Sequence, residues 1–167
     1  MFWHYTTGRH IDAIFNRGVL EPHVASWAQG GLSAVWFSTN DFWESSVNCA
    51  VQRPATQHRL LGTREMTELL CDGLFRFSVK STVGVVTWGQ YCEESRLTNR
   101  CVEACRRVAA IEGSHPGRWL ACLGEVHADE WLTVERWYGD QWGVIEGVEE
   151  VLPPLWAEED FLLQAAG

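Results

Sequence analysis

The first forty residues constrain the fold most, because they switch twice between the two periods of regular secondary structure. Residues 2–6 are rich in aromatic and β-branched side chains and predict a short strand. Apolar residues then recur at helical spacing over residues 9–17, with Thr7 as a suitable N-cap and Gly18 as a stop. The apolar, aromatic residues 34–38 predict a second strand. The chain therefore opens in the order strand, helix, strand.

The rest of the chain predicts two more helices and several strands. We expect helices over residues 64–71, capped by Thr63, and 97–112. Alternation predicts a half-buried strand over residues 74–79. Further strands are expected over residues 119–126, 131–138 and 141–145, the last two as a hairpin, and residues 83–88 are either a strand or a turn. Residues 48–62 have no clear period and contain Pro54, which predicts a loop.

This order of elements is typical of an α+β fold with much antiparallel pairing. A chain of 167 residues with 46% hydrophobic content suits one domain with a real core. We assign that domain to residues 1–152 and a C-terminal tail to residues 153–167. Within the tail, residues 155–163 form a short amphipathic piece.

The amino-acid composition limits the kinds of partner that this chain can bind. The formal net charge of −9 opposes a large phosphate-binding face, although five arginines between Arg96 and Arg118 form either a local basic patch or a solvated face. The ten Trp residues suit a core and its rim, or a pocket for a flat ligand. There is no signal peptide and no apolar run long enough to span a membrane, so we expect a cytoplasmic protein.

The six cysteines lack the spacing of a zinc site, so no metal is predicted. We expect them to be reduced, small apolar residues. Cys101 and Cys105 lie four residues apart on one helix face, and a metal site formed by them with a distant His is the alternative.

Polar side chains lie on the first two predicted strands. His4 and Thr6 point to one side of their strand and Tyr5 to the other, while Ser38 and Thr39 end the second strand. If the strands are neighbours, His4, Thr6 and one of these hydroxyls line one cleft. A histidine there can bind hydroxyls or act as an acid or base near pH 7. Alternatively, His4 is structural and the hydroxyls cap turns.

Three glutamates compete for the role of an acid. A carboxylate within an apolar strand is unfavourable unless it is paired or used. Glu125 stands where a strand enters a loop, Glu130 lies in the next loop, and Glu135 lies within a predicted hairpin strand, where it can simply face outward. We favour Glu125.

These motifs resemble the NAD-dependent ADP-ribosyltransferase superfamily. The matching pieces are His4-Tyr5-Thr6, residues 14–18 with their Ile-x-x-x-Gly pattern, residues 35–39, and Glu125. Within this superfamily, the pattern of motifs is similar to that of the DarT-type DNA ADP-ribosyltransferases, which carry a late Glu-Val like Glu125-Val126. Uncharacterised bacterial proteins with the pattern Trp-His-Tyr-Thr-Thr, Trp-Phe-Ser and Trp-Glu are also similar. The usual second-strand Tyr is replaced by Ser38-Thr39, which is nearer to the Arg-type pattern.

The resemblance implies a split, mostly antiparallel sheet flanked by helices, with NAD as cofactor. It implies Glu125 and His4 as catalytic residues: Glu125 stabilises the oxocarbenium-like ribose and holds its 2′-hydroxyl, and His4 binds the adenosine ribose. The implied cofactor-binding residues are His4, Tyr5, Thr6, Trp36, Ser38, Thr39 and Trp43. Trp36, Phe37, Phe42 or Trp43 is the candidate that stacks on nicotinamide, and Arg9 or Arg17 the candidate for the pyrophosphate.

The resulting hypothesis is an NAD-dependent effector that transfers ADP-ribose to a macromolecule, with a protein favoured over nucleic acid by the negative charge. A toxin of a toxin–antitoxin pair or a phage protein fits this type. The alternative is a non-enzymatic inhibitor or effector that binds a nucleotide or a protein in a Trp-lined groove. A phosphotransferase on a related fold is a third possibility, although the N-terminal half has few basic phosphate ligands.

Overall fold

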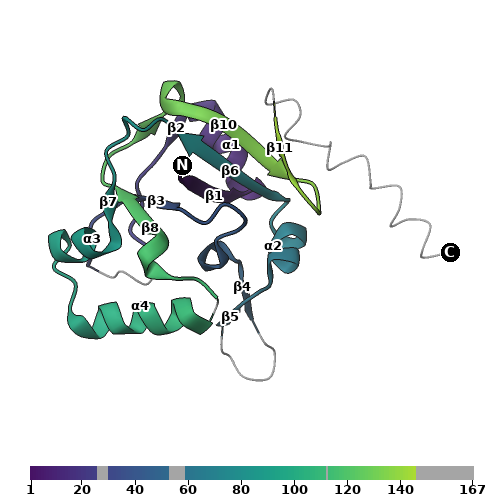
Figure 1. Cartoon of the computed structure of the whole chain (residues 1–167). Helices are drawn as coiled ribbons and strands as arrows, with labels where there is room; N and C mark the ends of the chain where they lie inside the picture. Colours follow the sequence, from purple (N-terminus) through teal and green to yellow (C-terminus); the bar gives the residue numbers. More distant parts are fainter. Residues whose placement is uncertain (26–29, 53–58, 112, 146–167) are drawn as a thin grey trace.

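The computed structural model describes residues 1–25, 30–52, 59–111 and 113–145 (Figure 1). The helices are α1 (Gly8–Arg17), α2 (Arg64–Leu70), α3 (Trp88–Glu94) and α4 (Asn99–Ile111). The longer strands are β1 (Trp3–Thr7), β3 (Val35–Ser38), β6 (Leu74–Val79), β8 (Trp119–Cys122) and β10 (Trp131–Trp137). The shorter strands are β2 (Val19–Leu20), β4 (Ala50–Gln52), β5 (Arg59–Leu61), β7 (Val86–Thr87), β9 (Val126–His127) and β11 (Trp142–Val144). Short 3-10 turns are η1 (Ser45–Val47), η2 (Pro116–Arg118) and η3 (Ala128–Glu130).

A seven-stranded sheet in the order β11-β10-β6-β1-β3-β8-β7 forms the centre of the fold. All its strand pairs are antiparallel. Two small ladders, β2-β9 and β4-β5, lie outside this sheet. The predicted α+β fold with a mostly antiparallel sheet is therefore confirmed.

The sheet is weakly joined at its middle. β1 pairs with β6 along its whole length, through five Cα partners from Trp3↔Ser78 to Thr7↔Leu74. Its pairing with β3 on the other side consists of Trp3↔Ser38 alone. β1 and β3 therefore share one end and leave the rest of their facing edges without a ladder.

Alternation along the strands sorts the side chains onto two sheet faces. Helix α1 packs through Ile11 on the first face, which we call the α1 face and which carries Val35, Phe37, Phe75 and Phe77. Helices α3 and α4 pack on the second face, where Trp88, Tyr91, Cys105 and Ala109 meet Trp119 and Ala121 of β8. A second-face cluster of Trp3, Tyr5, Trp43, Leu74 and Trp137 covers β1 and β6. Both faces of the central strands are thus buried.

Two predicted helix ends and a hairpin turn are confirmed. Thr7 occupies the N-cap position of α1, but its side chain makes no capping hydrogen bond. Gly18 ends α1 in the left-handed conformation, with φ 64°, and its N–H donates to the carbonyls of Ile14 and Phe15. The Thr63 hydroxyl accepts a hydrogen bond from the N–H of Met66 and caps α2. Gly139 also has a positive φ, of 95°, in the turn between β10 and β11, which confirms that hairpin.

Four sequence predictions are wrong. The single strand expected over residues 119–126 is two strands in different sheets, β8 and β9, with residues 123–125 between them. Residues 48–62 contain the β4-β5 ladder, because Ala50–Gln52 and Arg59–Leu61 pair across residues that lie outside the described part. Strand β6 is buried along its whole length, because Arg76 and Ser78 find polar partners on β10. Trp88 begins α3, where the Thr87 side chain and Gln90 form a capping box. The predicted tail, residues 153–167, lies outside the described residues.

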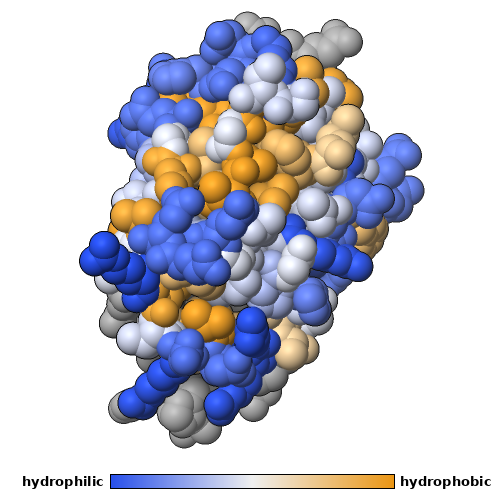
Figure 2. Space-filling model, turned by 60° about the vertical axis from the view of Figure 1, so that its left-hand side comes forward, coloured by the Kyte–Doolittle hydropathy of each residue, from blue (hydrophilic) through white to orange (hydrophobic). Residues whose placement is uncertain are grey.

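On the face shown in Figure 2, apolar residues gather mainly in the upper half and hydrophilic residues surround them. Across the described ranges, no helix is both long enough and apolar enough to cross a bilayer. None of the six cysteines forms a disulfide. Burial raises the pKa of Cys105 to about 12, so this thiol stays protonated within the α3–α4 cluster.

Candidate functional site

A cavity of about 520 Å³ lies between β1, α1 and β2, and we call it the α1 cavity. This volume is in the range of small-molecule and cofactor sites. His4 and Thr6 of β1 contribute to its wall from the α1 face. The other lining residues are Tyr5, Thr7, Arg9, His10, Ala13, Ile14, Arg17, Val19, Leu20, Glu21, His23, Val47, Cys49 and Cys71. The cavity borders the edge where β1 and β3 are not paired.

His4 bridges this unpaired edge. Its Nδ1 lies 2.9 Å from the carbonyl oxygen of Trp36 on β3, and the ring packs between Phe37 and Phe77. Since a carbonyl oxygen only accepts hydrogen bonds, Nδ1 carries the proton and Nε2 is the acceptor of the neutral ring. Burial lowers the pKa of His4 to about 4, against the opposing effect of the Trp36 hydrogen bond, and His23 and His10 lower it further. His4 is thus a neutral hydrogen-bonding group near pH 7.

The wall of the α1 cavity is richer in basic than in acidic groups, although the whole chain is acidic. Arg9, Arg17, His10 and His23 line it together with one carboxylate, Glu21. Arg17 lies 2.6 Å from Glu21; the Arg17 side chain is exposed and that of Glu21 is half-buried. The Arg9 guanidinium donates to the Leu70 carbonyl oxygen and lies 3.9 Å from Asp72. Two exposed guanidinium groups on one wall suit an anionic ligand.

A smaller cavity of about 150 Å³ lies on the second face, and we call it the Glu44 cavity. Its lining residues are Trp3, His4, Tyr5, Trp36, Phe37, Ser38, Glu44, Ser46, Val47 and Trp119. His4, Tyr5 and Val47 line both cavities. The two cavities are therefore neighbours on either side of the β1–β3 edge.

Glu44 is only 4% exposed. Ser38 Oγ donates to its Oε2 over 2.7 Å, and Ser114 Oγ donates to its Oε1. The N–H of Ser46 lies 3.4 Å from the same Oε1. Three uncharged donors thus hold the carboxylate at the cavity wall.

The structure brings some predicted cofactor residues together and separates others. His4 and Thr6 line the α1 cavity as expected. Ser38 lies on the opposite face, because it pairs with Trp3 and not with the His4 side of β1. The predicted grouping is met only in part: His4 lines both cavities, Thr6 lines only the α1 cavity, and Ser38 lines only the Glu44 cavity.

The remaining predicted residues belong to the second face or to the surface. The Tyr5 hydroxyl donates to the Asn40 carbonyl over 2.5 Å, and burial raises the Tyr5 pKa to about 12. Trp36 packs edge-on against Tyr91, 4.6 Å between ring centroids. Trp43 is buried against Tyr5, and Thr39 is exposed.

The three predicted glutamates lie outside the lining of both cavities. Glu125 is exposed and lies 3.6 Å from Nε2 of His127. The next residue, Val126, pairs with Leu20, which lines the α1 cavity. Glu130 accepts a hydrogen bond from the His127 N–H and caps η3.

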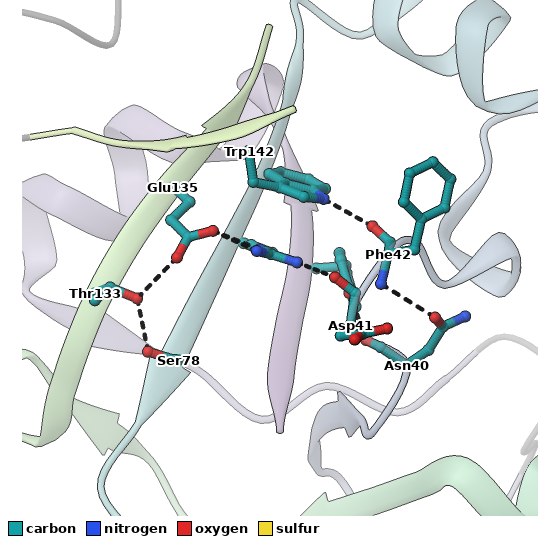
Figure 3. Close-up of polar contacts among 9 residues, drawn as sticks. Asn40, Asp41, Phe42, Ser78, Thr133, Glu135 and Trp142 are labelled. Atoms are coloured by element: carbon teal, nitrogen blue, oxygen red, sulfur yellow. Dashed lines mark hydrogen bonds and ion pairs between the residues drawn. The ribbon is translucent and has the colours of Figure 1, made fainter. Parts of the chain in front are cut away.

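Glu135 belongs to a buried ion pair on the second face. Its Oε2 lies 2.7 Å from Nε and 2.5 Å from a terminal nitrogen of Arg76. Figure 3 shows the polar contacts that continue from Glu135 to Thr133 and on to Ser78. The Arg76 guanidinium also lies 3.8 Å from the ring centroid of Trp3. Glu135 is thus fully engaged with the fold, and the expectation that it faces outward is wrong.

Sequence reasoning missed Glu44 as a site residue. A signal was present: a carboxylate directly follows the aromatic pair Phe42-Trp43, six residues after a strand-ending Ser38. Asn40 folds the intervening turn, with its Nδ2 donating to the Trp43 carbonyl and its Oδ1 accepting from the Phe42 N–H. This turn returns Glu44 to Ser38.

Within the described ranges, no group of three His, Cys, Asp or Glu side chains is arranged to hold a metal ion. Comparison with protein-family models, with curated proteins and with solved structures found no match to this chain. The assignment of function therefore depends on the motifs and on the geometry of the two cavities.

Proposed function

We propose that the chain binds NAD in the α1 cavity and transfers ADP-ribose from it to a macromolecular acceptor. The observation that carries the proposal is the composition of one wall: His4 and Thr6 on β1 face the same cavity as Arg9 and Arg17 on α1. The same two elements, β1 and α1, carry the motifs that resemble ADP-ribosyltransferases, namely His4-Tyr5-Thr6 and residues 14–18. A volume of about 520 Å³ accommodates a nucleotide.

The chemical groups of NAD match this wall. Its pyrophosphate carries the negative charge that the Arg9 and Arg17 guanidinium groups complement. A ribose hydroxyl can donate to Nε2 of His4, whose Nδ1 is already fixed by the Trp36 carbonyl. The hydroxyl of Thr6 offers both a donor and an acceptor beside it.

The proposed reaction exchanges one bond at the ribose C1′ atom. The glycosidic bond to the ring nitrogen breaks, and its electron pair moves to that nitrogen, so that neutral nicotinamide leaves. The ribose becomes oxocarbenium-like and is stabilised by a nearby carboxylate. The acceptor nucleophile then forms the new bond to C1′ and gives up its proton to solvent.

The direct test is the release of nicotinamide from NAD, with and without a cell extract that supplies acceptors. We expect release by the unaltered chain and its loss in His4→Ala. His115→Ala, at the exposed N-cap position that precedes η2, is the matched control and retains the activity. If the unaltered chain neither releases nicotinamide nor gains thermal stability from NAD, the proposal is rejected.

The second candidate is a protein that binds the nucleotide without transferring it. One observation favours it: Glu125, Glu130 and Glu135 do not line either cavity. In this case NAD and ADP-ribose raise the melting temperature equally, and no nicotinamide appears. A pull-down is then expected to recover a stoichiometric binding partner, and no protein becomes ADP-ribosylated.

A further inference from the structure

We propose that the Glu44 cavity binds an aromatic cation, with Glu44 as its counter-charge, and that this cation is the pyridinium ring of NAD. The identity of the cation rests on the proposed function, whereas the cation site itself rests on the geometry of the cavity. The inference moves the nicotinamide end of the ligand to the second face of the sheet. It also makes Glu44 the carboxylate closest to the reacting bond.

Glu44 is a buried carboxylate held by uncharged donors. Its side chain is buried, and its hydrogen-bond donors are two hydroxyls and one backbone N–H. Among the residues that the structure describes, no Lys, Arg or His nitrogen lies within 4 Å of its oxygens. Buried carboxylates are normally paired with a cation or a metal. A ligand that brings a positive charge completes the pair.

Glu135, the other buried glutamate on this sheet face, differs from Glu44 in having a cationic partner. Glu135 has the Arg76 guanidinium at 2.5 and 2.7 Å, and Arg76 is covered by Trp3. The fold therefore supplies an internal cation to one buried carboxylate. For Glu44 it supplies hydroxyl donors and a cavity.

The walls of the Glu44 cavity suit a flat cation in size and chemistry. Trp3, Trp36, Trp119 and Tyr5 line the cavity together with Glu44. The faces of Trp and Tyr rings attract cations, and the effect increases when water is excluded. A cavity of about 150 Å³ can enclose a single aromatic ring, as an engineered cavity of that size binds benzene. An aromatic cation combines the charge and the size that this cavity selects.

The Glu44 cavity lies beside the α1 cavity. His4, Tyr5 and Val47 line both of them, at the edge where β1 and β3 are not paired beyond Trp3↔Ser38. A dinucleotide with its phosphates near Arg9 and Arg17 can thus place its ring across this edge. Loss of the glycosidic bond makes the ring neutral and shifts the positive charge to the ribose, which keeps the charge near Glu44.

The test compares two probes that differ mainly in charge, 1-methylnicotinamide and nicotinamide, by calorimetric titration of the unaltered chain. We expect 1-methylnicotinamide to bind about tenfold more tightly, the scale of a cation–π contact with an ion pair. In Glu44→Gln this preference disappears. Glu103→Gln, at an exposed position of α4 where Glu103 pairs with Arg106, is the control and keeps the preference.

Equal affinity of the unaltered chain for the two probes, or binding of neither, overturns the inference even if Glu44→Gln fails to fold. So does a preference that survives in a folded Glu44→Gln chain. A titration with NAD and with ADP-ribose separates the two proposals. If 1-methylnicotinamide binds through Glu44 and neither nucleotide binds, the cation site stands and the proposed NAD function fails.

Discussion

Nδ1 of His4 lies 2.9 Å from the carbonyl oxygen of Trp36 and bridges β1 and β3 beyond their single Cα pair. An antiparallel pair normally continues with backbone hydrogen bonds at this point. A side chain that replaces the ladder leaves an opening beside it, and this is where the two cavities meet. The imidazole therefore has a structural contact through Nδ1 and a free ring edge for a ligand.

The first prediction concerns pH and His4. The folded chain lowers the pKa of His4 from 6.5 to about 4, so between these values the unfolded chain binds more protons. Stability therefore falls as the pH decreases from 6.5 through 4, by up to about 3 kcal/mol at 1.36 kcal/mol per pKa unit. Urea unfolding at a series of pH values measures this slope. His4→Asn should flatten it, and an unchanged slope in that variant contradicts the assignment.

A second prediction concerns the two arginines of the α1 cavity. Arg17→Ala should weaken ADP-ribose binding about tenfold, since one charge-assisted contact to phosphate is lost. Arg106→Ala on α4 is a close control, because Arg106 pairs with Glu103 at 2.7 Å much as Arg17 pairs with Glu21 at 2.6 Å. Calorimetric titration should show no change in the control. Equal effects of the two substitutions would exclude a phosphate contact by Arg17.

Local signals in the sequence predicted the elements around the α1 cavity well. The spacing of apolar residues in α1, its stop at Gly18 and the alternation of His4 with Tyr5 are properties of short segments. Each depends on backbone geometry within a few residues. The side of β1 on which His4 and Thr6 lie could therefore be predicted before the fold was known.

The positions of Ser38, Glu44 and Glu135 relative to the cavities could not be predicted from the sequence, for a physical reason. Ser38 lies opposite either His4 or Trp3, depending on which strand pairs with β1 and in which register. This register is set by pairing between residues that are far apart in the sequence. From the sequence alone, Glu135 could not be distinguished from a residue that faces solvent, because its partner Arg76 is 59 positions away. Glu44 reaches its position through the turn at Asn40 and a contact with Ser114, 70 positions along the chain.

A third prediction separates a structural from a catalytic role for Glu135. Glu135→Leu leaves the Arg76 guanidinium buried without its counter-charge and should destabilise the fold by about 3–5 kcal/mol. Adding Arg76→Met removes that charge as well, and the double variant should recover much of the loss. Urea unfolding gives the coupling free energy. Where the double variant is folded, its ADP-ribose affinity should equal that of the unaltered chain, because the pair lies on the face opposite the α1 cavity.

The last prediction concerns the junction that positions α1. Gly8 begins this helix, and its N–H donates to the Gly73 carbonyl over 3.0 Å. A Cβ at Gly8 would lie 2.0 Å from the carbonyl oxygen of Asp72, a backbone atom that no rotamer change can move. We expect Gly8→Ala to destabilise the fold by about 3 kcal/mol, at the upper end for overpacking.

Gly89→Ala in α3 is the matched control. The nearest atom to its added Cβ is the Thr87 hydroxyl oxygen at 4.0 Å, so this helical position should gain about 0.5–1 kcal/mol. Because Gly8→Ala must push α1 away from the α2–β6 turn, it should also reduce ADP-ribose affinity in the fraction that folds, whereas Gly89→Ala leaves that affinity unchanged. Urea unfolding and calorimetric titration of both variants measure the two effects. Gly8→Ala with normal stability would mean that α1 is not fixed by this contact and that the wall bearing Arg9 and Arg17 is set elsewhere.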